Sequence, residues 1–157
     1  MPRDKELNKA RSYALRLLKI RQRSEEELRF RLRQKRFTPD TINFLIANLK
    51  DAGFVDDLRF AFAWAKEKIN KPLGFKRIVF ELKQKNIKEP IIEEVVSRIK
   101  NAYSEHEAIK NIISSKFDNT VNKTEGKFNS KARNRIFGFL LRRGFSPEAI
   151  SEVLNKL

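Results

Sequence analysis

The only histidine of the chain, His106, is the first residue to consider as a catalyst. It lies between Glu105 and Glu107, and imidazole and carboxylate groups are the usual agents of general acid–base catalysis. All three residues fall at the expected start of a helix, where the helix dipole stabilises acidic side chains and a histidine is simply exposed. We therefore interpret His106 as a surface residue and predict that the protein is not an enzyme.

The chain has few of the residue types that usually bind metal ions or cradle phosphates. The chain has no cysteine and no second histidine, so it lacks the usual nitrogen and sulfur ligands of zinc. The adjacent carboxylates Asp56-Asp57 and Glu93-Glu94 fit a helix cap and a solvated helix face, respectively. The five glycines form no Gly-rich loop of the kind that cradles phosphates. We predict that the protein uses no metal and no cofactor.

Basic side chains are more informative. Arg29, Arg33 and Arg36 follow one another at i, i+4 and i+7, which places them on one helical face. Like charges stacked in this way repel one another, a cost that an anion lying against them would offset. We therefore predict contacts to phosphates or to an acidic protein surface. The candidate contact residues are Arg21, Arg23, Arg29, Arg33, Arg36, Lys76, Arg77, Lys131, Arg133, Arg135 and Arg142.

The positive charge is concentrated near the two ends of the chain. Thirty-five Lys and Arg against twenty Asp and Glu give a net charge of +15. Residues 1–36 carry a net +8 and residues 123–143 a net +6, whereas residues 37–122 carry only +2. This distribution favours a long molecule that binds a polyanion at both ends over a surface that is merely soluble.

Two other groups of side chains have both a structural and a binding interpretation. Lys35, Lys85 and Arg143 each precede a central apolar residue by two positions, in the last turn of an expected helix. The helix dipole stabilises a cation there without any ligand, and we favour that role. Aromatic residues can stack on nucleic-acid bases when exposed, but core packing is the better interpretation for most of them in a helical protein. The aromatic candidates are Phe60, Trp64, Phe75, Phe80 and Phe128.

One apolar spacing occurs three times and indicates the elements that position these residues. Intervals of four, five and five residues separate the members of three sets: Leu28, Leu32, Phe37 and Ile42; Ile78, Leu82, Ile87 and Ile92; Ile136, Leu140, Phe145 and Ile150. Helical periodicity alone explains the intervals within a helix but not the same break and restart each time. The sequence therefore predicts an all-α protein of three tandem three-helix repeats, whose function lies in an extended surface.

Capping residues divide the chain into three units. We assign residues 1–53 to repeat one with a basic N-terminal arm, 54–101 to repeat two and 102–157 to repeat three. The first helix is expected near residues 7–22, and a loop rich in Asn, Thr, Lys and Gly is expected at 118–129. Ser24 with Glu27 forms a capping box, Thr38-Pro39 begins a helix, and Asp56-Asp57 caps another. Gly53 and Asn86 are predicted to end helices in the left-handed conformation.

Three features that the sequence lacks indicate its cellular compartment: a membrane-spanning apolar run, a signal peptide and cysteine. No apolar run approaches the roughly 20 residues that a bilayer-spanning helix needs. The N-terminus is charged and has no apolar core of a signal peptide, and the absence of cysteine fits a reducing compartment. We expect a cytoplasmic protein that does not contact a membrane and that is a monomer.

Several segments, in this order, resemble the RecX family, which regulates the bacterial recombinase RecA. They are 24–32 (SEEELRFRL), 51–57 (DAGFVDD), 60–61 (FA), 74–78 (GFKRI) with 81–82 (EL), and 142–150 (RRGFSPEAI). Together with the three-unit plan, the resemblance runs from about residue 10 to the C-terminus. One departure is Asn86, where the family usually has glycine before the central isoleucine; asparagine tolerates the same left-handed conformation.

The resemblance implies an elongated, curved array of three-helix repeats. It also implies a modulator, mainly negative, that binds in the groove of the RecA filament on DNA and restrains strand exchange, ATP hydrolysis and co-protease activity. A second hypothesis rests on charge alone: a sequence-nonspecific DNA- or RNA-binding module that coats nucleic acid, single- or double-stranded. A third is a helical array that binds an unrelated acidic protein. The sequence does not rank RecA against DNA as the primary contact.

Overall fold

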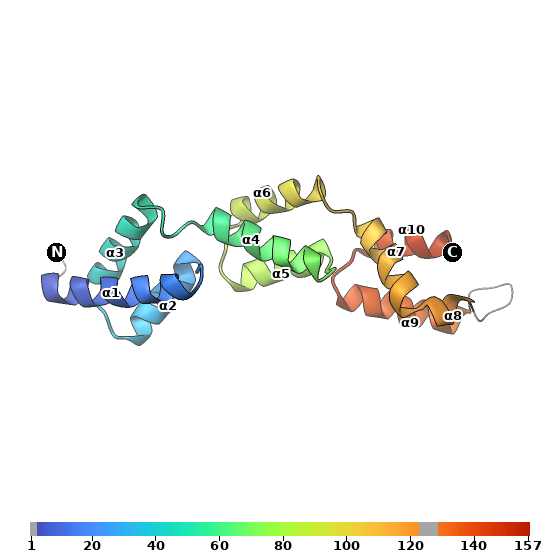
Figure 1. The fold of residues 1–157 in the computed structure, drawn as a ribbon, viewed down its shortest axis with the longest axis horizontal. Coiled ribbons are helices and arrows are strands. Elements are labelled where there is room, and N and C mark those ends of the chain that lie inside the picture. The colour runs from blue at the N-terminus through green and yellow to red at the C-terminus, as the bar shows by residue number, and fades with distance from the viewer. Residues whose placement is uncertain (1–2, 123–128) are drawn as a thin grey trace.

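A computed structural model describes residues 3–122 and 129–157, and every regular element in these ranges is a helix. The helices form three bundles that follow one another in a row, with α1 in the bundle at one end and α9 in the bundle at the other (Figure 1). The prediction of an all-α protein built from three three-helix repeats is confirmed.

The three units have the same order of helices. Repeat one contains α1 (Asp4–Ile20), α2 (Glu25–Gln34) and α3 (Pro39–Asp51). Repeat two contains α4 (Asp57–Asn70), α5 (Phe75–Gln84) and α6 (Glu89–Lys100). Repeat three contains α7 (Glu105–Lys116), α9 (Ser130–Arg142) and α10 (Pro147–Asn155), with the short α8 (Asp118–Asn122) after α7. The first helix thus begins at Asp4, three residues before the expected start.

Each repeat has its own hydrophobic core. The repeated apolar positions are its centre: Leu28 and Leu32, Ile78 and Leu82, Ile136 and Leu140 are all fully buried. Small residues on the first helix, Ala10 and Ala14 in repeat one and Ala61 and Ala65 in repeat two, are also completely buried. Removing apolar area from water is the main force that holds each bundle together, and here it acts within repeats.

The predicted caps fix where α2, α3 and α4 begin. Ser24 Oγ accepts the amide of Glu27 at 3.2 Å, and Thr38 Oγ1 accepts that of Thr41 at 3.4 Å. Asp56 Oδ1 likewise accepts the amide of Arg59 at 3.0 Å. The capping box at Ser24 takes a different form from the one expected, because the Glu27 carboxylate pairs with Arg21 and Arg23.

Middle helices end in the same way in all three repeats. The residue before the central apolar position has a positive φ each time: 62° at Arg36, 56° at Asn86 and 88° at Gly144. The next amide then reaches back to close the helix, as Phe145 N–H does to the carbonyl of Leu140 at 3.3 Å. The predictions for Asn86 and for Gly53, with a φ of 78°, are confirmed. Arg36 occupies the same conformation without being glycine or asparagine, which is unfavourable for its side chain.

The predicted loop at 118–129 is wrong in its first part. Residues 118–122 form α8, which begins directly after Phe117 and packs against α7. Phe117 itself is buried in the core of repeat three and meets Phe139 edge-on at 5.3 Å, so the chain stays against the bundle here. Residues 123–128 lie outside the described residues.

Candidate functional site

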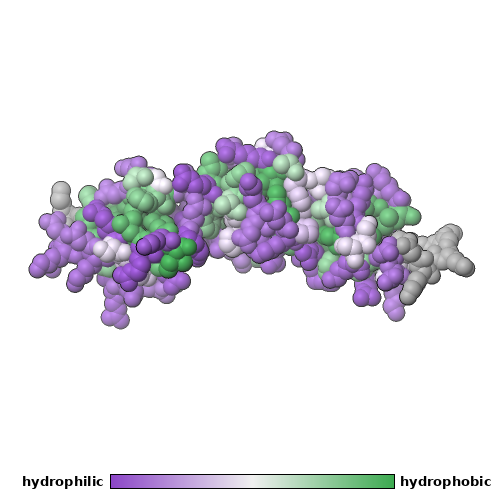
Figure 2. Space-filling model, viewed as in Figure 1, coloured by the Kyte–Doolittle hydropathy of each residue, from purple (hydrophilic) through white to green (hydrophobic). Residues whose placement is uncertain are grey.

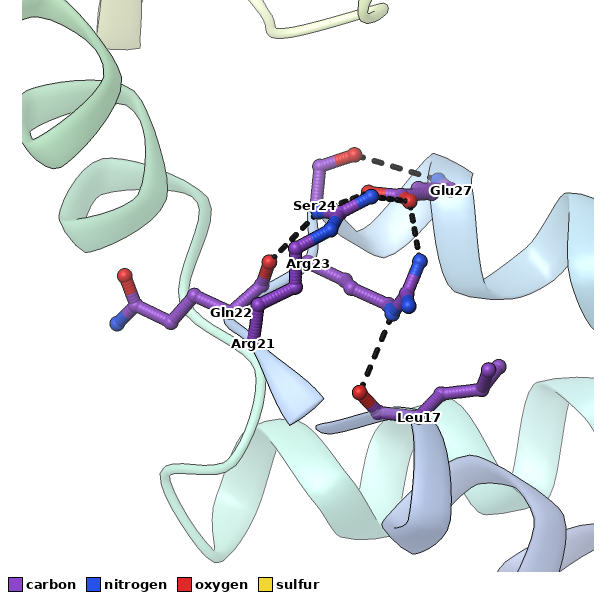
Figure 3. A network of polar contacts seen from close by, with 6 residues as sticks. All are labelled: Leu17, Arg21, Gln22, Arg23, Ser24 and Glu27. Atoms are coloured by element: carbon purple, nitrogen blue, oxygen red, sulfur yellow. Dashed lines mark hydrogen bonds and ion pairs between the residues drawn. The ribbon is translucent and has the colours of Figure 1, made fainter. Parts of the chain in front are cut away.

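The cations that precede α2 are held by an acidic residue of that helix. Both guanidinium groups, of Arg21 and Arg23, contact the Glu27 carboxylate, and Arg23 Nε also donates to the carbonyl of Leu17 at 3.3 Å (Figure 3). Partial burial acts to raise the pKa of Glu27, but hydrogen bonds and charge from the two arginines outweigh it and leave the pKa below its usual value. Arg23 is only 7% exposed, so we leave it out of the proposed contact surface.

Two further candidates on α2 are also engaged by neighbouring residues. Arg29 Nε pairs with Glu25 at 3.0 Å and Arg29 Nη1 donates to Asn43 Oδ1 at 2.7 Å, while Arg33 pairs with Glu26. These carboxylates neutralise the charge that we had expected an external anion to meet. Arg36 is exposed and has no ion pair among the described residues. Of the five candidates at this end, Arg36 is therefore the one cation that is both exposed and unpaired.

The cations of α9 are different. Lys131, Arg135 and Arg142 are exposed and make no ion pair within the described ranges. Their spacing of i, i+4 and i+11 places them within a narrow stripe on one face of the helix. Arg133 does not belong to this stripe. Its Nη1 donates to the carbonyl of Leu154 at 3.2 Å and its Nη2 donates to Asn155, at the end of α10. We call Lys131, Arg135 and Arg142 the α9 stripe.

A matching stripe lies on α1, which sequence reasoning missed. Lys5, Lys9 and Arg16 repeat the spacing of i, i+4 and i+11, are exposed, and have no ion pair in the part of the chain that the structure describes. Glu6, one of the two carboxylates on this helix, accepts the Thr38 amide at 2.9 Å and the Thr41 hydroxyl at 2.8 Å instead. The signal was present in the sequence, since no acid follows Glu6 in α1. We call Lys5, Lys9 and Arg16 the α1 stripe.

The remaining basic positions divide into free and structural residues. Lys76 is exposed and has no ion pair among the described residues, whereas Arg77 pairs with Glu81 at 2.8 Å. Lys35 and Lys85 lie over the rings of Tyr13 and Trp64, at 5.4 and 4.1 Å from the centroids.

At the junction between repeats two and three, main-chain hydrogen bonds join the start of α5 to the residues that follow α9. Gly74 N–H donates to the carbonyl of Arg143 at 3.0 Å, and Lys76 N–H donates to that of Gly144 at 3.2 Å. The Arg143 side chain in turn donates to the carbonyls of Lys71 at 2.8 Å and Pro72 at 3.3 Å. A Cβ on Gly74 would lie 2.1 Å from the Gly144 oxygen, so only glycine allows this approach.

A carboxylate links neighbouring repeats at each of the two junctions. Glu105, 8% exposed, accepts the Phe75 amide at the start of α5 at 2.8 Å and the Ser146 amide before α10 at 3.3 Å. One repeat earlier, Asp57 accepts the Glu25 amide at the start of α2 at 2.8 Å. Burial raises the pKa of Asp57 above its usual value despite this hydrogen bond. The middle helices of repeats one and two, α2 and α5, thus each receive an N-terminal acceptor from the next repeat.

Aromatic candidates divide between core and surface. Phe60 is buried, and Trp64 donates its Nε1 proton to Glu81 at 3.0 Å, so both serve the fold of repeat two. Phe75 packs edge-on against Tyr103 at 5.7 Å, and burial raises the pKa of that tyrosine to about 12. Phe80 is 52% exposed, as is Phe30, at 51%, in the same position of repeat one. Phe128 lies outside the described residues.

The side chains that could serve catalysis or metal binding have structural partners or lie apart from one another. His106 is partly exposed and its Nε2 lies 2.6 Å from Glu152 Oε2, which joins α7 to α10. The described residues hold no group of three or more His, Cys, Asp and Glu side chains that could bind a metal ion. They also hold no helix long and apolar enough to cross a bilayer. Most of the face shown in Figure 2 is hydrophilic, with apolar patches between the polar side chains.

Three family models match the chain in order. They describe the first, second and third three-helix domains of RecX and match residues 10–49, 56–96 and 120–154. The chain is also similar in fold to the crystal structure of RecX from Lactobacillus salivarius, with a TM-score of 0.84 over 98% of this chain and 97% of that one. At 22% identity, this second likeness concerns the fold alone.

Curated relatives extend the similarity over almost the whole sequence. The regulatory protein RecX of Clostridium acetobutylicum is 35% identical over 150 residues, which are 94% of this chain and 68% of that protein. The regulatory protein RecX of Thermotoga petrophila is 33% identical over 156 residues, 99% of this chain and 88% of that protein. The three domain matches and these identities show that the chain belongs to the RecX family of regulatory proteins.

Proposed function

We propose that this protein binds the RecA filament on DNA and mainly restrains it, lowering strand exchange, ATP hydrolysis and co-protease activity. Such a role would belong to homologous recombination, DNA repair and the SOS response. Family membership supports a RecX regulatory role, and the name RecX implies RecA as the partner in general. The observation that carries the finer proposal is the pair of unpaired cation stripes on α1 and α9, in the two end repeats of an elongated molecule.

Each stripe suits a row of anions. Eleven residues separate its first and last cations, which is about 16 Å along an α-helix. Single strands carry a phosphate charge at each nucleotide, so a stripe of this length meets several phosphates or a row of carboxylates on a protein surface. No carboxylate of the described residues competes for these cations, so their charge is available without breaking an ion pair.

Restraint then comes from occupancy of a surface. With its ends bound to phosphates or to acidic protein surface, the molecule lies along the filament groove and its middle repeat packs across neighbouring RecA subunits. Occupying the groove bars an incoming duplex and opposes the subunit movements that ATP hydrolysis and filament growth require. The carboxylate links from Asp57 and Glu105, together with the main-chain contact of Gly74 and Lys76 with Arg143 and Gly144, hold neighbouring repeats against each other for this role.

A second candidate function uses the same stripes on naked nucleic acid. A protein that coats DNA without sequence preference would also inhibit RecA, by removing its substrate. The unpaired cations favour this candidate as well, because they would release counterions from any phosphate backbone. The two candidates differ in whether RecA must be present for tight binding.

The deciding experiment measures DNA-dependent ATP hydrolysis by preformed RecA filaments, titrated with this protein, beside its binding to the same DNA without RecA. We expect inhibition well below one copy per RecA subunit, at concentrations that leave naked DNA largely unbound. Inhibition that rises only as bare DNA becomes coated would establish the second candidate and overturn the first.

A further inference from the structure

A large groove lies between repeats two and three, away from the cation stripes. Its volume is about 910 Å³, and α5, α6, α7 and α10 all contribute to its walls. Its floor is apolar, formed by Phe75, Val79, Phe80 and Val96. Phe80 leaves 52% of its surface in water at this place, which is unfavourable for an aromatic side chain unless something covers it.

Repeat one does not have this apolar floor. Fifty residues earlier, the positions of Phe75, Val79 and Lys100 are occupied by Glu25, Arg29 and Lys50. There Glu25 pairs with Arg29 at 3.0 Å and with Lys50 at 3.0 Å, so the equivalent surface is closed by ion pairs. The apolar groove is therefore a particular feature of the second junction and not a consequence of the repeat fold.

The two walls of the groove carry opposite charge. Lys76, Lys83 and Lys100 line it from α5 and α6, and Glu148 and Glu152 line it from α10. Lys76 and Lys100 have no ion pair among the described residues, and Lys100 lies 5.7 Å from the centroid of the Phe75 ring. A nucleic acid would meet the two glutamates as well as the lysines. A peptide can match both walls, because it can carry acids along one edge only.

The polar part of the groove lining is held firmly. Ser104, Glu105 and Ser146 form part of its lining, and Glu105 joins α5 to the start of α10 through two backbone amides. The main-chain contact of Gly74 with Arg143 lies directly beside this link in the chain. A groove between elements fixed in this way is preformed, which lowers the entropic cost of binding.

We propose that this groove binds an amphipathic helical segment on the protein component of the RecA filament. The segment would bury apolar residues, spaced at i, i+3 or i+4 and i+7, on Phe75, Val79 and Phe80. Acidic residues along one of its edges would face Lys76 and Lys100. This inference rests on the proposed function, since it names the partner surface that the middle of the molecule contacts while the stripes hold its ends.

The test compares the full chain with Phe80→Ala and with the double variant Lys76→Glu/Lys100→Glu. Phe30→Ala is the matched control, since Phe30 has the same repeat position and the same exposure but lies outside the groove. Binding is measured to preformed RecA–DNA filaments and, separately, to the same DNA alone. We expect Phe80→Ala and the double variant each to weaken filament binding about tenfold or more. Phe80→Ala should leave binding to naked DNA unchanged, and Phe30→Ala should change filament binding less than about twofold.

The other outcomes are distinct. If the wild-type chain does not bind filaments, the proposed function and the groove inference both fail. If wild type binds and both groove variants bind equally well, the groove inference alone fails. An equal loss of naked-DNA binding by Phe80→Ala would make the ring a base-stacking platform. Concentration-dependent dimers of the free chain that Phe80→Ala abolishes in sedimentation would place a second copy in the groove, and either result would overturn the proposal.

Discussion

At the scale of single residues, the neighbours of a basic side chain decide whether it is available to a partner. Arg29 and Lys131 are both cations on a middle helix, but Arg29 has a carboxylate four residues before it, at Glu25. Lys131 has no acid in the following turns of α9. An ion pair at this spacing neutralises the charge and fixes the side chain, so it lowers the attraction for an external anion. The local pattern of acids thus ranks the cations better than their number does.

Glu27 gives the sharpest prediction at this scale. It is the carboxylate partner of Arg23, a guanidinium that is only 7% exposed. Glu27→Gln should lower the free energy of unfolding by about 2 kcal/mol at pH 7, since a charged hydrogen bond to a buried cation is lost. Urea denaturation measures this directly. Glu26→Gln removes the exposed pair with Arg33 instead, and its cost should stay below about 1 kcal/mol.

The same residue predicts a pH dependence. The pKa of Glu27 is lowered in the folded protein from its ordinary value of 4.5, so the folded state favours the ionised carboxylate. Its contribution is fully present above pH 4.5 and is lost as the pH falls through the lower folded pKa. The difference in the free energy of unfolding between wild type and Glu27→Gln should therefore be constant above about pH 5 and should decrease in more acidic solution. A difference that persisted unchanged at acidic pH would contradict this assignment.

At the scale of elements, local signals were sufficient for the fold and insufficient for the junctions. Ser24, Thr38 and Asp56 could be predicted as caps because a cap bonds to an amide only three residues away. The link from Glu105 to Phe75 joins residues thirty positions apart, and nothing in the sequence around either residue indicates it. Local chemistry therefore predicted the three bundles, and tertiary packing decided how they meet.

For the candidate site, the sequence predicted basic residues, and only part of the predicted set is exposed and unpaired in the structure. Lys131, Arg135 and Arg142 were among the predicted contacts and are exposed and unpaired. Arg23 was also among them, but its burial depends on the path of the chain from α1 to α2, which a helical pattern does not specify. The α1 stripe could not be predicted from the charge totals of segments, because such totals do not distinguish paired from unpaired cations.

The junction between repeats two and three can be tested with one methyl group. Gly74 has an ordinary negative φ of −78°, so Gly74→Ala adds no backbone strain but places Cβ 2.1 Å from the Gly144 oxygen. We expect a loss of about 3 kcal/mol, or separate unfolding of repeats two and three, because the main-chain contact cannot form. Differential scanning calorimetry distinguishes one transition from two.

Gly53→Ala is the control for this substitution. Its φ of 78° makes alanine unfavourable, but no atom lies within 4 Å of the added Cβ. The cost should be about 1 kcal/mol, from the backbone alone, with a single transition as in wild type. If Gly74→Ala were no more harmful than Gly53→Ala, the close approach of Gly74 to Gly144 would not hold the repeats together.

At the scale of the whole molecule, three small cores in a row replace one large core. Each repeat buries its own apolar residues. Compared with one compact domain of the same number of residues, such an array buries less apolar surface but is longer. That length separates the α1 and α9 stripes into different end repeats (Figure 1). A binding surface of this kind gains affinity from two linked contacts, provided that the junctions keep both ends oriented to one partner.

The two-ended contact predicts how binding should respond to salt. One variant replaces Lys5, Lys9 and Arg16 by glutamine, and a second replaces the three residues of the α9 stripe in the same way. For each variant we plot the logarithm of the affinity for RecA–DNA filaments against the logarithm of the salt concentration. The slope of this plot should fall in magnitude by about 2 relative to wild type, because each cation is expected to neutralise one phosphate of a single strand. The combined variant should lose the sum of both effects in free energy, because the stripes share no partner. Arg21, Arg29 and Arg33 provide the matched control, since replacing them removes the same charge from ion-paired positions and should change the slope by less than one third as much. A slope that changed equally in all three variants would mean that net charge alone governs binding, whereas a change confined to one stripe would leave a single-ended contact.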